Sequence, residues 1–114
     1  MKTDTSKILT NISYGTWVQS GSPSVAEILA YAGFDWICAD LEHSDIDWTT
    51  FTSIVRAVKR HGVVPIARVS DNDVLAIRKA LDCGAMGVIV PMIGNAADAR
   101  KAVMAAKYPP QGIR

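Results

Sequence analysis

The sequence lacks the features that would direct it to a membrane, to nucleic acid or to export. Its 114 residues contain no apolar run near the roughly 20 residues that cross a bilayer. Lysine and arginine (12) nearly balance aspartate and glutamate (11), and they form no basic stripe. The start of the chain is polar and leads into no signal-type apolar stretch. We therefore expect no membrane partner, no nucleic-acid partner and a cytoplasmic location.

Cysteine is also scarce, and the two that occur follow no functional spacing. Cys38 and Cys83 match neither a metal-ligand motif nor a redox motif, and each lies in an apolar context. The sequence predicts that both are buried, reduced thiols, as is usual in the cytoplasm.

What the sequence does contain is one local pattern repeated four times, a short apolar run followed by apolar residues at helical spacing. The runs predict strands at 14–18, 34–39, 63–67 and 87–90. Ser22 and Asn95 have the residue types of helix N-caps, and either Asp71 or Asn72 can cap the helix between 71 and 84. Glycine stops three of the predicted helices, at Gly33, Gly62 and Gly84.

Strands that alternate with helices predict an α/β fold with a parallel sheet. Two architectures fit, a doubly wound open sheet and part of a (β/α)₈ barrel. No glycine-rich phosphate loop follows residues 14–18, and the short units favour the barrel. A whole barrel needs roughly 250 residues. We therefore predict that residues 1–114 form about four βα units, an incomplete TIM barrel in one domain. The chain is expected to be incomplete at its C-terminus or to pair with another copy.

Polar side chains gather where the predicted strands end, which is where parallel sheets bind ligands. Asp40, Glu42 and His43 follow the second strand, and Arg68 follows the third. We expect Asp40 to accept a hydrogen bond from one ring nitrogen of His43, so that the other nitrogen acts as a general base. The planar fork of Arg68 suits a substrate carboxylate or an enolate oxygen.

The same residues have structural explanations that their spacing leaves open. His43 could cap the next helix, and its pairing with an aspartate could be a surface bond. Arg68 could form a structural salt bridge with Asp40 or Glu42. By default Asp82 is a solvated helix residue, and Trp17 is an aromatic of the core or of a pocket wall.

Several short motifs resemble the HpcH/HpaI family of class II, metal-dependent pyruvate aldolases. They occur in the family's order and together span residues 14–114. The motifs are GTW at 15–17, AGFDW at 32–36, DLEH at 40–43, ARV at 67–69, LDCG at 81–84, VPM at 90–92 and KYPPQGIR at 107–114.

The resemblance implies a (β/α)₈ barrel that cleaves 4-hydroxy-2-oxo acids to pyruvate and an aldehyde, and that runs the reverse condensation. It implies that His43 is the acid/base residue with Asp40 as its dyad partner, and that Arg68 binds pyruvate and stabilises its enolate. Trp17 would line the pocket. Two further carboxylates, Glu42 and Asp82, would lie near metal-bound waters.

The resemblance also implies a divalent cofactor, Mg²⁺, Mn²⁺ or Co²⁺, held by a Glu and an Asp on strands beyond the fourth. We expect no direct metal ligand within these 114 residues, and very little aldolase activity from them alone. The partners expected are a small oxo-acid substrate and further copies of the chain in a homo-oligomer. The alternatives are an inactive half-barrel that only assembles, and a related oxo-acid lyase on the same barrel.

Overall fold

In the computed structural model, residues 4–114 are described and form an α/β fold around one parallel sheet. The strands are β1 (Gly15–Val18), β2 (Trp36–Asp40), β3 (Val64–Arg68) and β4 (Gly87–Ile89). The helices are α1 (Ser6–Thr10), α2 (Pro23–Tyr31), α3 (Trp48–Lys59), α4 (Val74–Asp82) and α5 (Ala96–Ala106). Four of the helices follow the four strands in turn, as the repeated pattern predicted, whereas the short helix α1 was not predicted.

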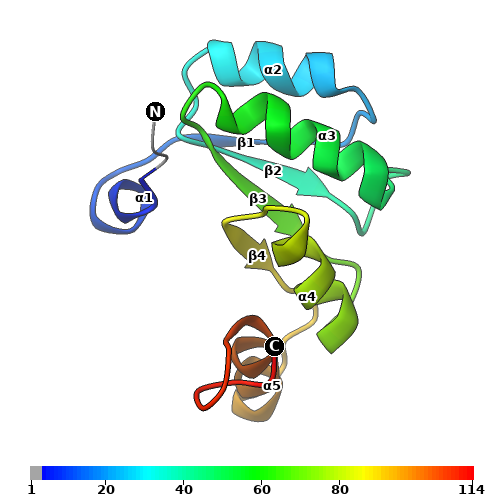
Figure 1. The fold of residues 1–114 in the computed structure, drawn as a ribbon. Coiled ribbons are helices and arrows are strands. Elements are labelled where there is room, and N and C mark those ends of the chain that lie inside the picture. Colours follow the sequence, from blue (N-terminus) through cyan, green and yellow to red (C-terminus); the bar gives the residue numbers. More distant parts are fainter. Residues whose placement is uncertain (1–3) are drawn as a thin grey trace.

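The order of the strands distinguishes between the two architectures. The sheet runs β1-β2-β3-β4, and every pair of neighbours is parallel. Each crossover therefore steps in the same direction, and right-handed crossovers then place α2 to α5 on one face. A doubly wound sheet reverses its strand order and covers both faces. Figure 1 shows the helices following one another along the sheet, with α2 beside α3 and α4 near α5. The prediction of a partial barrel is confirmed.

The hydrophobic core lies between the sheet and this layer of helices. One face of α3 is apolar at helical spacing and is buried through Phe51, Ile54 and Val58. From the sheet, Ile37 and Ala67 are also buried and belong to the same cluster. Burying an aromatic or aliphatic side chain stabilises a fold by roughly 1.5–3 kcal/mol. This packing sets the distance between α3 and strands β2 and β3.

The helix caps agree with the sequence in two cases and differ in one. Ser22 and Asn95 cap α2 and α5, as predicted. The prediction of Asp71 or Asn72 for α4 is wrong, because the helix begins later and Asp73 accepts the N–H of Ala76 at 2.9 Å. Asn72 instead donates from its side chain to a backbone carbonyl of α5, so it joins two helices.

Strands β2 and β3 lie slightly further along the chain than predicted. Asp35 lies just before β2, and its side chain accepts the backbone N–H of Tyr14 at 2.8 Å. Asp40 and Arg68, expected just after their strands, are the last residues of β2 and β3 and are aligned with each other. The shift brings two opposite charges into the sheet itself.

The two cysteines differ in burial. Cys38 is buried in β2, as predicted, and burial raises the pKa of its thiol to about 12. Cys83 is only partly buried, which contradicts the prediction, because it caps the end of α4 where the helix meets solvent. Both are unpaired.

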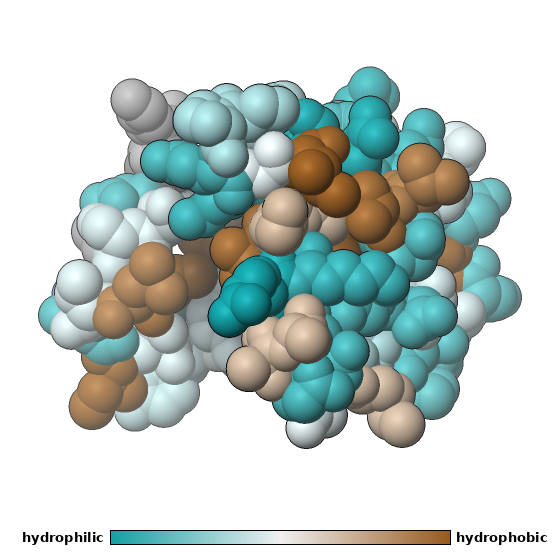
Figure 2. All heavy atoms as spheres, turned by 90° about the horizontal axis from the view of Figure 1, so that it is seen from below, coloured by the Kyte–Doolittle hydropathy of each residue, from teal (hydrophilic) through white to brown (hydrophobic). Residues whose placement is uncertain are grey.

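Large apolar side chains also reach the surface. Figure 2 shows them in separate groups among hydrophilic residues, on the face seen from below. None of the helices within residues 4–114 has the length and apolar character needed to cross a membrane. The apolar residues exposed by more than 60% are Leu9, Ile12, Tyr14, Ile28, Tyr31, Leu75, Met92 and Tyr108.

Candidate active site

The carboxyl ends of β2 and β3 are joined by a two-pronged ion pair. Arg68 donates from Nε to Oδ1 of Asp40 at 2.9 Å and from Nη2 to Oδ2 at 2.5 Å. The pairing register places the two residues side by side, so the planar guanidinium meets the carboxylate edge to edge. The salt bridge that the sequence left open for Arg68 is therefore present.

Asp40 is fully buried, yet its carboxylate is well satisfied. Besides the Arg68 bonds, it accepts the side-chain amide of Gln19 at 2.8 Å and the backbone N–H groups of Glu42 and His43, each at 3.1 Å. The hydrogen bonds from Arg68, followed by those from Gln19 and the backbone, hold the pKa of Asp40 well below its usual range, although burial opposes them. Asp40 therefore stays ionised across the physiological range.

Arg68 is held from three sides. The ring of Trp17 lies 4.7 Å from the guanidinium carbon, and a carboxylate oxygen of Glu42 lies 3.3 Å from Nε. The bonds to Asp40 raise the pKa of Arg68, so it is a permanent cation. Its Nη1 has no hydrogen-bond partner among residues 4–114, and 24% of the side chain is exposed. The fork is thus fixed on one edge and available on the other.

His43 does not use Asp40 as the sequence predicted. Its backbone N–H donates to Asp40, whereas its ring Nε2 lies 3.5 Å from a carboxylate oxygen of Glu42. The predicted ring bond is absent because Arg68, Gln19 and the backbone already occupy the Asp40 oxygens. The hydroxyl of Ser44 also bonds the Asp40 carbonyl and tightens the turn. The imidazole is 64% exposed at the rim.

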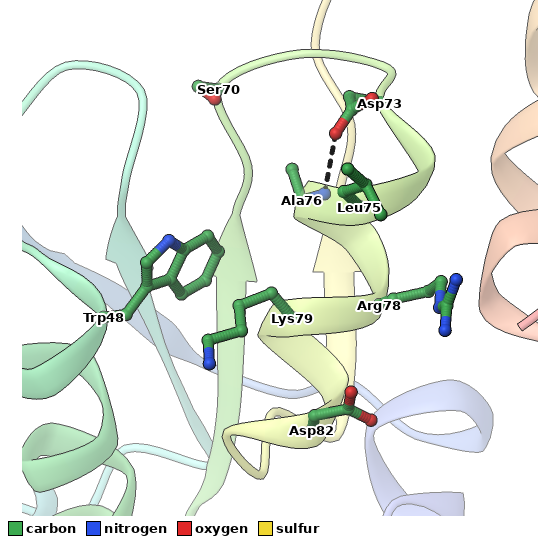
Figure 3. A pocket seen from close by; sticks show the side chains of 8 residues that line it. All are labelled: Trp48, Ser70, Asp73, Leu75, Ala76, Arg78, Lys79 and Asp82. Atoms are coloured by element: carbon green, nitrogen blue, oxygen red, sulfur yellow. Dashed lines mark hydrogen bonds between the residues drawn. The ribbon is translucent and has the colours of Figure 1, made fainter.

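Asp82 is not brought to this cluster. It is the last residue of α4, which runs back from the carboxyl end of β3 to the amino end of β4. Figure 3 shows it at the opposite end of α4 from Ser70 and Asp73, which follow β3. Its carboxylate accepts Arg114 Nη2 at 2.8 Å and is largely exposed. Within one copy of the chain, Asp82 therefore lies at the far end of the sheet.

The cavity in Figure 3 lies mainly between α3 and α4, and Ser70, just after the end of β3, also lines it. It has a volume of about 550 Å³. Its walls come from the start of α3 and from one side of α4. Trp48, Lys79 and Asp82 line it, and none of the residues of the ion-pair cluster does. The cavity and the candidate site are thus separate features.

The part of the chain that the structure describes offers no metal centre of its own. Among residues 4–114, no three His, Cys, Asp or Glu side chains come together so that they could hold a metal ion. Asp40 cannot turn toward a metal without leaving Arg68. These residues alone therefore do not fit a divalent cation, and no chemical step is assigned to one.

Gln19 follows the first predicted strand, at the edge where the sequence places the polar side chains, but the sequence alone assigned it no role and no partner. The available signal was its position, two residues after Trp17 at the end of β1, since alternate residues of an extended chain share one face. Trp17 and Gln19 reach Arg68 and Asp40 respectively. One end of β1 thus contacts both members of the ion pair.

Residues 13–114 match the family model for the HpcH/HpaI aldolase/citrate lyase domain. The chain belongs to this family. A Pseudomonas putida relative named 2-dehydro-3,6-dideoxy-6-sulfogluconate aldolase is 48% identical over 100 residues, which are 88% of this chain and 39% of that protein. A Shigella boydii relative named 4-hydroxy-2-oxo-heptane-1,7-dioate aldolase is 42% identical over 88% of this chain and 38% of its own length.

A solved HpcH/HpaI family structure has the same fold. The crystal structure of an HpcH/HpaI aldolase/citrate lyase family protein from Burkholderia cenocepacia J2315 superposes with a TM-score of 0.89 at 34% identity. The match covers 96% of this chain and 46% of that one. The chain thus spans about two fifths of the curated relatives described above, at 39% and 38% of their lengths.

Proposed function

We propose that the protein is a carbon–carbon lyase that cleaves 4-hydroxy-2-oxo acids to pyruvate and an aldehyde. Membership of the HpcH/HpaI family and the aldolase names of its relatives support this class of reaction. The observation that carries the proposal is the arginine fork at the strand ends, fixed by Asp40 and open at Nη1. Its substrate is a small oxo acid.

Arg68 binds the carboxylate of the substrate and stabilises the negative charge that develops on the enolate oxygen during cleavage. When the bond between C3 and C4 breaks, its electrons move into the oxo acid and form the enolate of pyruvate, which then takes up a proton at C3 to give pyruvate. A permanent guanidinium donor at that oxygen stabilises the enolate without having to reorient. Trp17 stacks on the guanidinium and forms part of the pocket wall.

His43 handles the proton of the substrate hydroxyl. In cleavage, its imidazole takes the proton from the C4 hydroxyl as the aldehyde carbonyl forms, and in condensation it returns that proton. A positioned general base contributes roughly 10²–10⁴-fold in rate. Glu42 lies beside the ring and can orient it, in the role that the sequence predicts for Asp40.

The family resemblance also implies a cofactor, a metal-bound water network, an assembly and a cellular location, and we propose these as well. We propose a divalent Mg²⁺, Mn²⁺ or Co²⁺ as the cofactor, with its direct ligands outside these residues. Glu42 lies in the cluster and is therefore placed near such metal-bound waters. Asp82 lies at the far end of the sheet and could reach them only from another copy of the chain. A homo-oligomer and a cytoplasmic location are proposed on the same basis.

The test is pyruvate release from a 4-hydroxy-2-oxo acid, measured with the complete natural protein and with each of the three metals added. We expect His43→Ala to lower kcat by 10²-fold or more. His61→Ala is the matched control, since His61 lies beyond α3 and pairs with Glu27. A His43→Ala protein that keeps its full rate would refute the role of His43, and a wild-type protein that releases no pyruvate would refute the proposed function.

A second candidate is an inactive half-barrel whose role is assembly. Within residues 4–114, β1 and β4 each have only one neighbouring strand, and edges of this kind readily pair with other chains. Analytical ultracentrifugation together with the pyruvate assay distinguishes the candidates, because this one requires a stable oligomer without activity. A related oxo-acid lyase on the same barrel would be recognised by product analysis.

A further inference from the structure

Gln19 lies outside every role assigned above, although it contacts the buried end of the site. Its side-chain Nε2 donates to Oδ2 of Asp40 at 2.8 Å, while the residue itself is exposed. The amide oxygen has no hydrogen-bond partner among residues 4–114. An exposed glutamine with one amide atom on a fully buried carboxylate is placed to influence that carboxylate.

The oxygen that Gln19 reaches also accepts one of the two hydrogen bonds from Arg68. Oδ2 of Asp40 accepts both Gln19 Nε2 and Arg68 Nη2, whereas Oδ1 accepts Arg68 Nε and two backbone N–H groups. The backbone therefore anchors Oδ1, and Gln19 is the only donor other than Arg68 that anchors Oδ2 within the described residues. Without Gln19, the carboxylate can rotate about its Oδ1 side.

Rotation of the carboxylate would release the coplanar pairing that sets the direction of Arg68. A bidentate pair gives geometric specificity only while both of its bonds lie in one plane. Trp17, from the same end of β1, covers the guanidinium but offers no hydrogen bond to hold it in that plane. The direction of Nη1 therefore depends on the orientation of Asp40.

We propose that Gln19 is a positioning residue, which holds Asp40 so that Arg68 presents Nη1 to the oxo-acid substrate. This inference rests on the proposed function for its substrate, but its geometric part concerns Arg68 alone. Gln19 acts through Asp40 and is not itself a catalytic residue.

The decisive variants are Gln19→Met, which keeps the length but removes the donor, and Gln19→Glu, which also places a carboxylate against Asp40. Gln111, the only other glutamine, is exposed in the C-terminal segment and gives the matched controls Gln111→Met and Gln111→Glu. In the condensation direction we expect Gln19→Met to raise the KM for pyruvate roughly tenfold, the scale of one hydrogen bond to a charged group. We expect kcat to change less than KM, and Gln19→Glu to have the larger effect.

A second readout does not depend on activity. The Nη2–H signal of Arg68 in a nitrogen-15 NMR spectrum, assigned by its loss in Arg68→Lys, reports how firmly that arm of the guanidinium is held on Oδ2 of Asp40. We expect its proton to exchange with water several-fold faster in Gln19→Met than in Gln111→Met, with the same melting temperature in both.

The two readouts separate the inference from the proposed function. Faster exchange in an enzyme that never releases pyruvate would refute the proposed function and leave the positioning of Arg68 supported. A raised KM with unchanged exchange would mean that Gln19 touches the substrate directly, which overturns the inference. Unchanged KM in an active enzyme would overturn it as well, whatever the exchange rate.

Discussion

Within residues 4–114, two aspartate–arginine pairs lie at opposite ends of the sheet, and they differ in almost every physical respect. Asp40 and Arg68 join neighbouring strands through two hydrogen bonds, and the aspartate side chain is 0% exposed. Asp82 and Arg114 join the end of α4 to the last residue through one bond, and the aspartate is 62% exposed. The same two residue types thus form a rigid buried pair and a solvated surface contact.

In the surface pair, stacking on Tyr108 and burial also hold Arg114 in place. The guanidinium of Arg114 lies 4.8 Å from the ring centre of Tyr108, and its Nε is buried without a hydrogen-bond partner in the described part of the chain. Stacking and packing therefore place Arg114, and Asp82 only meets it. The difference teaches that burial, rather than residue type, decides which pair matters for stability and for the site.

The largest expected effect is that of Asp40→Asn on stability. Removing one partner of a buried ion pair costs about 3–5 kcal/mol. We expect a loss of about 3 kcal/mol in the free energy of unfolding at pH 7, at the low end of this range because Arg68 is 24% exposed. Urea denaturation measures it. A loss no larger than that of Asp82→Asn would show that the two pairs are equivalent.

The contribution of Asp40 should also disappear in acid. Its pKa in the folded protein is depressed, so the unfolded chain takes up a proton first as the pH falls through about 4. The stability gap between the wild type and Asp40→Asn is therefore full at pH 5–7 and narrows as the pH falls from about 4 toward the depressed pKa. Urea denaturation at pH 7, 5, 3 and 2 tests the sign. A gap that widened in acid would contradict the assigned cause.

The thiols beside the two aspartates should react at different rates. Cys38, in β2, is buried with its pKa raised to about 12, whereas Cys83, next to Asp82, is partly exposed. Because the thiolate is the reactive form, we expect iodoacetamide at pH 8 to modify Cys83 well before Cys38. Mass spectrometry of peptides from briefly labelled native protein measures the order. Equal labelling of both thiols would mean that β2 opens readily.

The smallest expected effect is that of Asp82→Asn on stability. An exposed ion pair contributes roughly 0–1 kcal/mol. We expect the substitution to change the free energy of unfolding at pH 7 by less than about 1 kcal/mol. In 1 M salt this change should be smaller still, because salt screens the exposed ion pair. The same urea titrations provide the value. A loss comparable to that of Asp40→Asn would mean that the C-terminal segment depends on this contact.

Much of the fold follows from local patterns. The four apolar runs, the caps Ser22 and Asn95 and the stop at Gly33 depend on neighbours a few residues away, and the structure has all of them. Gly33 has a positive φ of 99°, which glycine adopts without strain. The α4 cap was wrong by one residue, because Asn72 has a second partner on α5 that no local pattern reveals.

The candidate site was only partly predictable. That Asp40, Glu42, His43 and Arg68 lie at one edge follows from parallel strands, because their carboxyl ends meet. The hydrogen-bond partner of each of these residues cannot be predicted from strand direction alone, because it depends on the register that aligns Asp40 with Arg68. The contact of Gln19 with Asp40 was not predicted for the same reason, since it crosses from the end of β1 to β2.

The sequence by itself determined the four βα units, the family and the edge of the sheet that carries the polar cluster, because these depend on periodicity, short motifs and strand direction. Only the tertiary structure decided that Asp40 pairs with Arg68 and Gln19 instead of the His43 ring, and that Asp82 lies at the far end. Hydrogen-bond partners are chosen by positions in space to within a few tenths of an ångström, and those positions are set by packing between segments far apart in the chain.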